Sequence, residues 1–270
     1  MEDTEELNNQ KLAVITGASR GIGFELAKLF AERGYNLLIT ADSDDIFEAR
    51  DQLIDFGVDV EAIRADLSRT TEVEKIYETI ANSDYALDSV CMNAGVGLSG
   101  RFVDNDLQTE LKIIQLNCSS IVHLSKLIIP EMLNNKHGKI LFTSSLAAEM
   151  PGPYLAVYAA SKAFVQSFAE AIRFELKDTG VTVTALQPGP TDTNFFHRAD
   201  MLDTPANKKE KDDPAEVAKD GFDAMMAGKD SVVAGSFKNK LKAAVARILP
   251  EETQAKVHTS DTKPDHVQEH

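Results

Sequence analysis

The sequence predicts an α/β fold built on a doubly wound parallel sheet of roughly seven strands with helices on both faces. Short apolar runs alternate along the chain with longer amphipathic segments, and strand–helix alternation of this kind produces a parallel sheet whose two faces are both covered. The composition, with 43% hydrophobic and 26% charged residues in 270, is that of a globular protein, and a single α/β domain of ~250 residues is a normal size.

The first strands and helices follow one another closely. Residues 11–16 form an almost continuous apolar run that ends in a glycine turn, as expected of a buried parallel strand. Residues 22–33 place their apolar side chains on one stripe of a helix, which Gly34 ends. The next strand is expected at residues 35–40, and the next helix at residues 46–56, which a glycine again follows.

The middle of the chain repeats this pattern. Residues 58–65 alternate between apolar and polar side chains and predict a strand, whereas residues 70–81 predict a helix. Residues 89–92 and 140–143 are expected as short buried strands. Between them, residues 109–133 carry apolar side chains most of the way round a helix, which indicates a helix buried on more than one side.

The last elements surround a long irregular segment. A second largely apolar helix is expected at residues 155–177, and a sixth strand at residues 181–186. Residues 195–213 combine turns and charges with little apolar periodicity, so we expect a long excursion there. The excursion rejoins the fold where Asp213 can cap a helix that begins at Pro214.

The chain is expected to form one domain over residues 11–249, because no linker divides that segment. Residues 1–10 are a polar N-terminal extension. Residues 250–270 are polar and almost without large apolar side chains, so we expect a disordered tail there.

Charge and composition restrict the partners. The 28 Lys+Arg and 43 Asp+Glu leave a net charge of −15, which argues against nucleic acid, since phosphate backbones need a basic surface. No apolar run reaches the ~18 residues of a membrane span, and acidic residues 1–10 do not resemble a targeting peptide. Cys91 and Cys118 lie in apolar segments without metal-ligand spacing, which favours a reducing compartment, the cytoplasm.

A glycine-rich turn lies directly between the first expected strand and the first helix. Its sequence, over residues 16–23, is Thr-Gly-Ala-Ser-Arg-Gly-Ile-Gly. Gly17 allows the tight turn, Gly21 lets the backbone approach a pyrophosphate, and Gly23 lets the helix pack closely on the strand. The N-terminus of the helix offers free N–H groups to phosphates. Glycines can also serve chain reversal alone, but this position favours a dinucleotide-binding, Rossmann-like domain.

The spacing Thr-Gly-x-x-x-Gly-x-Gly resembles that of the short-chain dehydrogenase/reductase family, and motifs further along the chain strengthen the resemblance. Asp66-Leu67 follows the third strand, where the family places an Asp beside the adenine ring, and Asn93-Ala94-Gly95 follows the fourth. Pro188-Gly189 follows the sixth strand, where the family lines the nicotinamide, and Thr191 is placed for its carboxamide. The expected cofactor-binding residues are Gly17, Ser19, Arg20, Gly21, Ile22, Gly23, Asp42, Asp66, Leu67, Asn93, Ala94, Gly95, Tyr158, Lys162, Pro188, Gly189, Thr191 and Thr193.

Tyr158 and Lys162 are the first two candidate catalytic residues. Positions i and i+4 lie on one face of a helix, so the phenol and the ammonium are expected to be neighbours. A Tyr with a pKa near ~10 is a poor base at neutral pH, but a nearby cation lowers that pKa. Chance alone also produces such pairs on helices.

Ser145 and Asn117 complete the expected set. Ser145 ends the fifth strand, thirteen positions before Tyr158, as the family's active-site serine does, and Ser144 is the weaker candidate. Asn117 lies in an apolar helix, either as a satisfied buried amide or, as the family implies, as the anchor of a water that relays protons to the Lys.

The resemblance implies hydride transfer between NAD(P)(H) and a small-molecule carbonyl or secondary alcohol. Tyr158 would be the general acid/base, Ser145 would polarise the carbonyl, and Lys162 would hold the nicotinamide ribose. No metal is expected, because the six His are scattered. Two alternatives stay open: a catalytically silent NAD(P)-binding sensor or scaffold, and a non-redox Tyr-Lys enzyme such as an epimerase.

The choice between NAD(H) and NADP(H) rests on opposing charges. Arg20 is the family's common NADP-favouring feature, whereas Asp42 stands where NADP-using relatives usually carry an Arg. The usual NAD carboxylate would be one position earlier, at Ala41, so the sequence departs from both patterns. Asp42 favours NAD slightly, because it would neutralise Arg20 and repel a phosphate by about 1–3 kcal/mol.

Substrate choice is expected to depend on a loop at about residues 191–213 and on residues 146–153. Apolar side chains in the first segment either cover an apolar substrate or only pin the loop; they are Phe195, Phe196, Met201 and Leu202. The two long helices carry more apolar surface than one sheet face can cover, which predicts a homodimer or homotetramer. The apolar residues in question are Ile113, Ile114, Ile121, Val122, Ile128, Ile129, Phe164, Phe168, Ile172 and Phe174.

Overall fold

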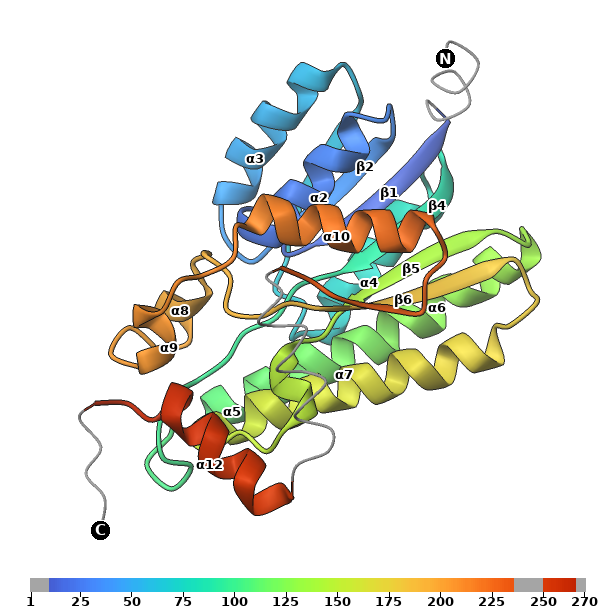
Figure 1. Cartoon of the computed structure of the whole chain (residues 1–270). Coiled ribbons are helices and arrows are strands. Elements are labelled where there is room, and N and C mark those ends of the chain that lie inside the picture. Colours follow the sequence, from blue (N-terminus) through green and yellow to red (C-terminus); the bar gives the residue numbers. More distant parts are fainter. Residues whose placement is uncertain (1–9, 236–249, 266–270) are drawn as a thin grey trace.

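A computed structural model describes residues 10–235 and 250–265 of the chain, so the N-terminal extension up to residue 9 and the segments 236–249 and 266–270 lie outside the described residues. Seven strands form one parallel sheet in the order β3-β2-β1-β4-β5-β6-β7 (Figure 1). The strands are β1 Lys11–Thr16, β2 Asn36–Ala41, β3 Val60–Arg64, β4 Ala86–Met92, β5 Gly138–Thr143, β6 Val181–Gln187 and β7 Ser231–Val233. The predicted fold class is confirmed.

Helices cover both faces of the sheet (Figure 1). Those on one face are α2 Gly21–Ala31, α3 Asp45–Leu53 and α10 Pro214–Met226, and those on the other are α4 Thr70–Ala81, α5 Leu107–Ile114, α6 Ser120–Asn134 and α7 Ala156–Glu175. Alternate residues of β1 enter the two cores: Val14 belongs to the core that contains Ile76 and Ile128, whereas Ile15 belongs to the core that contains Phe30 and Phe222. Both cores therefore anchor the same strand.

The strand order reverses between β1 and β4, which pair in parallel with Thr16 opposite Met92. The chain leaves these two neighbouring strands towards opposite faces of the sheet, so their ends open a crevice. In doubly wound folds, ligands bind in such a crevice at the carboxyl ends of the strands. The fold thus places a binding site beside Thr16 and Met92.

One long helix, Leu107–Asn134, contains an irregular turn. The segment Gln115–Ser119 is a π-helical turn between α5 and α6, and Asn117 lies in it. This helix of 28 residues has a mean hydropathy of 1.2, so it is long and apolar enough to span a membrane. However, Ile113, Leu124 and Ile128 are buried in the protein interior, which is the arrangement of a core helix.

The excursion after β6 contains two short helices, α8 Phe195–Arg198 and α9 Pro205–Lys208. It ends as predicted, because α10 begins at Pro214 and the Asp213 carboxylate accepts a hydrogen bond from the backbone N–H of Ala215 at 2.9 Å.

The disordered tail predicted for residues 250–270 is wrong over residues 250–265. Helix α12 spans Glu251–Thr262 and lies beside α9 (Figure 1). Lys208, the last residue of α9, forms an ion pair with Asp265, and Lys209, which follows it, forms one with Asp261. The Thr262 hydroxyl also donates to the carbonyl of Pro153 at 2.7 Å. These contacts are polar. The sequence of α12 therefore has no apolar stripe from which the helix could have been predicted.

Candidate active site

A cavity of about 530 Å³ opens at the carboxyl ends of the central strands, at the predicted crevice. Every residue predicted to bind a cofactor or to take part in catalysis lines this cavity except Gly23 and Asn117. Those two lie behind its wall, where Gly23 faces the backbone of Gly17 and Asn117 is bonded to the backbone of Val96. The structure therefore brings together residues that are up to 176 positions apart, from Gly17 to Thr193.

The turn between β1 and α2 requires glycine at two positions. Gly17 has a φ of +68°, a left-handed conformation that L side chains rarely adopt, and a Cβ there would lie 2.9 Å from the Cα of Ala94. A Cβ at Gly23 would lie 2.1 Å from the carbonyl oxygen of Gly17. The glycines thus let backbone meet backbone, and they leave the N-terminus of α2 open to the cavity.

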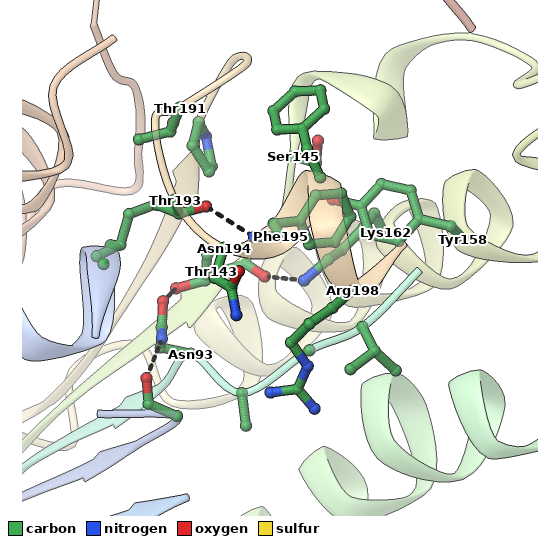
Figure 2. Close-up of a pocket in the computed structure, with 18 of the residues that line it drawn as sticks. Asn93, Thr143, Ser145, Tyr158, Lys162, Thr191, Thr193, Asn194, Phe195 and Arg198 are labelled. Atoms are coloured by element: carbon green, nitrogen blue, oxygen red, sulfur yellow. Dashed lines mark hydrogen bonds between the residues drawn. The ribbon is translucent and has the colours of Figure 1, made fainter. Parts of the chain in front are cut away.

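Asn93 connects this turn to the two strands beside it (Figure 2). Its amide donates to the carbonyls of Thr16 and Gly17 at 3.3 and 3.2 Å, and its Oδ1 accepts from the Thr143 hydroxyl at 3.2 Å. The Thr16 hydroxyl in turn accepts from the backbone N–H groups of Asn93 and Ala94. The ends of β1, β4 and β5 are therefore fixed to one another under the cavity floor.

Ser144 and Ser145 have different surroundings. The Ser144 hydroxyl is buried and donates to the carbonyl of Lys162 at 3.0 Å, so it supports the start of α7. The Ser145 hydroxyl accepts from the backbone N–H of Ala147 at 3.1 Å and also contacts Tyr158. Of the two serines, Ser145 is the one whose hydroxyl is directed to Tyr158.

Tyr158 and Lys162 lie on one face of α7, as their spacing predicted (Figure 2). The Lys162 Nζ lies 5.9 Å from the centre of the Tyr158 ring and donates to the carbonyl of Thr143 at 2.8 Å. The ring of Phe195, the first residue of α8, lies 5.1 Å from that of Tyr158. The excursion after β6 therefore contacts Tyr158, the candidate acid, directly.

Burial controls both pKa values. It raises the pKa of Tyr158 to about 12, with the hydrogen bond to Ser145 acting in the opposite direction. Burial lowers the pKa of Lys162 to about 8. We expected Lys162 to lower the pKa of Tyr158, but burial of the phenol dominates in this structure and the net shift is upward.

Asn117 is fully buried, and protein groups satisfy its amide. Its Oδ1 accepts from the N–H of Val96 at 3.0 Å, and its Nδ2 donates to the carbonyl of Val96 and to the Ser161 hydroxyl, each at 2.9 Å. A Cβ on Gly95 would lie 3.1 Å from the Lys162 Nζ and 3.3 Å from the Asn117 Oδ1. Asn117 thus supports the backbone beside Lys162.

Charged side chains surround the far end of the cavity. Asp66 is half-buried, and although burial alone would raise its pKa, hydrogen bonds from Ser68 and Lys112 lower it. The expected pair between Asp42 and Arg20 does not form. Arg20 pairs with Asp45, and Asp42 instead binds Arg198 of α8.

The apolar residues of the excursion serve two purposes. Phe196 and Met201 are buried in a small core with Leu155, and they also line the cavity. Phe195 lines the cavity beside Tyr158, whereas Leu202 is 54% exposed and does not line it. Three of the four predicted residues therefore both pin the segment and form the cavity wall.

Sequence reasoning missed several residues of the wall, which are Thr143, His258, Asp261 and Thr262. Glu149 and Arg198 lie in the two segments expected to select the substrate, but they were not named individually. Thr143 could have been found from its place at the end of a strand. Arg198 and the three α12 residues carry no motif, because contacts between distant surface segments bring them to the cavity.

Comparisons with known proteins agree with this site. Residues 11–201 match the family described as short chain dehydrogenase. The chain belongs to the short-chain dehydrogenase family. A relative in this family, the uncharacterized oxidoreductase YmfI of Bacillus subtilis, is 32% identical over 214 residues, which are 77% of this chain and 85% of the relative. Oxidoreductase UcpA of Salmonella typhimurium is 31% identical over 208 residues, 77% of each chain.

Solved structures of a short-chain dehydrogenase and of an alcohol dehydrogenase share the fold. The enzyme from Sphingobium yanoikuyae, in complex with NADPH, has a TM-score of 0.77 and 27% identity over 83% of this chain and 87% of that one. The alcohol dehydrogenase from the archaeon Thermococcus sibiricus, complexed with 5-hydroxy-NADP, has a TM-score of 0.73 and 26% identity over 83% and 95% of the two chains. Helix α12 lies beyond the segment that matches the family.

Proposed function

We propose that this short-chain dehydrogenase transfers a hydride between NAD(P)(H) and a small-molecule carbonyl or secondary alcohol. The observation that carries the proposal is the convergence of Ser145, Tyr158 and Lys162 on one cavity that also contains the glycine-rich turn. Tyr158 and Ser145 are in contact, as an acid and the hydroxyl that orients its partner should be.

The residues fit a dinucleotide. The turn at Gly17 and Gly23 has no space for side chains, so its backbone and the N-terminus of α2 face the cavity. Asp66 and Leu67 would hold the adenosine end, and Pro188, Gly189 and Thr191 the nicotinamide end. When bound, the nicotinamide supplies or accepts the hydride. The complexes of relatives with NADPH and 5-hydroxy-NADP support this assignment.

The chain's own residues handle the proton. In the reductive direction the Tyr158 hydroxyl, kept protonated by burial, donates its proton to the substrate oxygen, which the Ser145 hydroxyl orients. Lys162, with a pKa of about 8, stands beside Tyr158 in both charge states near neutral pH. It would stabilise the phenolate that proton donation leaves, and Asn117 would maintain the path by which the proton is replaced.

We propose a substrate with a largely apolar body. Beyond Tyr158 and Ser145 the cavity is lined by Leu146, Met150, Leu155, Phe195, Phe196 and Met201. Apolar walls bind apolar substrate groups by removing both from water. Glu149 lies on the same side and accepts from the Gln187 amide at 2.5 Å, so it is a fixed polar group in this wall.

We further propose a homo-oligomer in the cytoplasm. Ile113, Ile121 and Ile128, which we had counted towards an interface, are buried in the core. Exposed apolar side chains nevertheless remain on α5 and α7; they are Leu107, Leu111, Ile114, Phe164 and Phe174. A second copy of the chain would cover such side chains. The free thiols of Cys91 and Cys118 suit a reducing compartment.

Substitution of Tyr158 by Phe tests the function. The variant keeps the ring beside Phe195 but has no proton to donate, so turnover of ketones and aldehydes should fall about 10²–10⁴-fold. NAD(P)H affinity, measured by nicotinamide fluorescence, should change less than about twofold. Tyr154→Phe is the matched control, since Tyr154 does not line the cavity. Retention of most activity by Tyr158→Phe would disprove the catalytic assignment.

A further inference from the structure

The turn after β2 carries three aspartates, and each pairs with one arginine from a different part of the fold. Asp45 pairs with Arg20 of the glycine-rich turn, and Asp44 pairs with Arg64 at the end of β3 at 3.0 Å. Asp42 pairs with Arg198, the last residue of α8. The formal charges of the three pairs cancel, and two of the pairs, Arg20 with Asp45 and Arg198 with Asp42, line the cavity.

The pair formed by Arg198 and Asp42 joins segments 156 positions apart. The Arg198 Nη1 donates to the Asp42 Oδ1 at 3.1 Å, and its Nη2 donates to the Oδ2 at 2.5 Å. Both side chains line the cavity, and both keep solvent access, with exposed fractions of 43% and 31%. Arg198 extends away from the rings of Tyr158 and Phe195, although Phe195 begins the same short helix (Figure 2).

This pairing changes what Asp42 can do. Both of its oxygens accept from one guanidinium, so neither is directed to a ribose hydroxyl, and its charge is compensated. The sequence favoured NAD slightly because Asp42 was expected to neutralise Arg20 and repel a phosphate, but in the structure Asp42 pairs with Arg198 and leaves Arg20 to Asp45. The structure instead places an arginine fork beside Asp42, and guanidinium forks bind phosphate in the same two-pronged manner as carboxylate.

We propose that Arg198 is a cofactor-specificity residue that binds the 2′-phosphate of NADP(H), with Arg20 on the same side of the cavity. The proposal rests on the proposed function, because it assumes that a dinucleotide occupies this cavity. A phosphomonoester carries about −1.5 to −2 charges at neutral pH, so it competes well with the single charge of Asp42 for the guanidinium. Asp42 holds Arg198 in place until the phosphate arrives.

The proposal also gives α8 a second task. Arg198 at its end would contact the adenosine part of the cofactor, while Phe195 at its start contacts the ring of Tyr158. A bound 2′-phosphate would therefore hold the helix that lies against the candidate acid. NADH, which lacks this phosphate, would leave the Arg198 guanidinium paired with Asp42.

Binding of the two reduced cofactors tests the proposal without turnover. Dissociation constants for NADPH and NADH would be measured by nicotinamide fluorescence with the full-length wild type, Arg198→Ala, Asp42→Ala and Arg173→Ala. Arg198→Ala should weaken NADPH at least tenfold and NADH less than threefold. Asp42→Ala should tighten NADPH, because it removes the competing carboxylate. Arg173→Ala, which removes an arginine paired with Asp230 outside the cavity, should alter neither.

Three results would overturn the proposal: equal weakening of both cofactors by Arg198→Ala, no effect of Arg198→Ala on NADPH, and weaker NADPH binding by Asp42→Ala. Circular dichroism would verify the fold of each variant. If Arg198→Ala does not fold, Arg198→Lys replaces it, because it keeps the charge but loses the fork and should weaken NADPH about threefold. Wild type that binds neither cofactor would refute the proposed function itself, whereas binding that does not depend on Arg198 would refute only this inference.

Discussion

The two ends of the candidate active site are built in different ways. Under the cofactor, buried and half-buried polar groups fasten the ends of the strands to one another, as half-buried Asn93 does with Thr16 and Thr143. On the side that we propose for the substrate, α9 and α12 are joined by exposed ion pairs such as those of Lys208 and Lys209, outside the small apolar core around Phe196. The polar network at the strand ends fixes the residues proposed for chemistry, whereas the exposed ion pairs around α12 fix the cavity wall less firmly.

The energies of these contacts differ accordingly. A buried donor or acceptor that loses its partner costs about 1–3 kcal/mol, and Thr16 and Thr143, which bond Asn93, are buried, so this network tolerates little change. An exposed ion pair contributes about 0–1 kcal/mol, so no single pair on α12 is decisive. We expect substitutions at the strand ends to affect chemistry and folding, and substitutions on the substrate side to affect substrate binding.

Ser145 and Ser144 give the largest expected contrast within the rigid end. Ser145→Ala removes the hydroxyl that we propose orients the substrate oxygen, and the loss of such a group costs about 10²-fold in kcat/KM. Ser144→Ala removes the hydrogen bond to the carbonyl of Lys162, so it should lower the free energy of unfolding by about 1 kcal/mol while most activity remains. Steady-state kinetics and thermal melts separate the two. A greater loss of activity in Ser144→Ala would reverse our assignment.

Removal of residues 250–270 probes the substrate side. The truncated chain loses the Thr262 contact with Pro153 and the wall residues of α12, so KM for the carbonyl substrate should rise about tenfold, equivalent to about 1.4 kcal/mol. Affinity for NAD(P)H should stay within about twofold. Thr262→Val, which removes the hydrogen bond alone, should have an intermediate effect. If cofactor affinity falls together with substrate affinity, the two ends are not separable.

Lys162 gives the smallest expected effect, in the pH dependence of stability. Its pKa of about 8 in the folded protein is below that of an unfolded Lys. Between these two pKa values the unfolded state binds more protons, so stability rises with pH. Relative to Lys162→Met, the free energy of unfolding of the wild type should therefore increase by about 1 kcal/mol between pH 8 and pH 9.

Urea titrations at the two pH values measure that increase. The Tyr158 hydroxyl, with a pKa of about 12, stays protonated in this window and does not contribute. Lys219→Met, at an exposed lysine of α10, controls for the loss of one positive charge. A wild-type advantage that shrinks as the pH rises would contradict the sign of the shift.

The contrast between the strand ends and the cavity wall around α8 and α12 also explains what could be predicted from the sequence. Strand ends and the glycine-rich turn leave local signals, because a buried strand demands a continuous apolar run and a backbone contact demands glycine. Gly17, Asn93, Ser145 and Tyr158 therefore lie where their motifs predicted, on one cavity. The predicted helix at residues 70–81 matches α4 in full for the same reason.

The features that could not be predicted depend on contacts between distant residues, which leave no local pattern in the sequence. The pairing of Arg198 with Asp42 joins residues 156 positions apart, and α12 has no apolar stripe that would mark it as a helix against the protein. The pKa of Tyr158 also escaped prediction, because spacing shows the neighbouring Lys162 but not the depth of burial. Polar contacts over long distances and desolvation are properties of the assembled structure.

The π-helical turn at Gln115–Ser119 has a consequence for insertions and deletions. Such a turn contains one residue more than an α-helical turn, and single π turns are frequent at functional sites. Deletion of one residue here would restore regular winding, leave the helix on either side close to its present phase, and reshape the turn itself. The amide that now reaches Val96 and Ser161 would turn away from Lys162, although no side chain had been substituted. This helix therefore constrains the length of the chain as strictly as its composition.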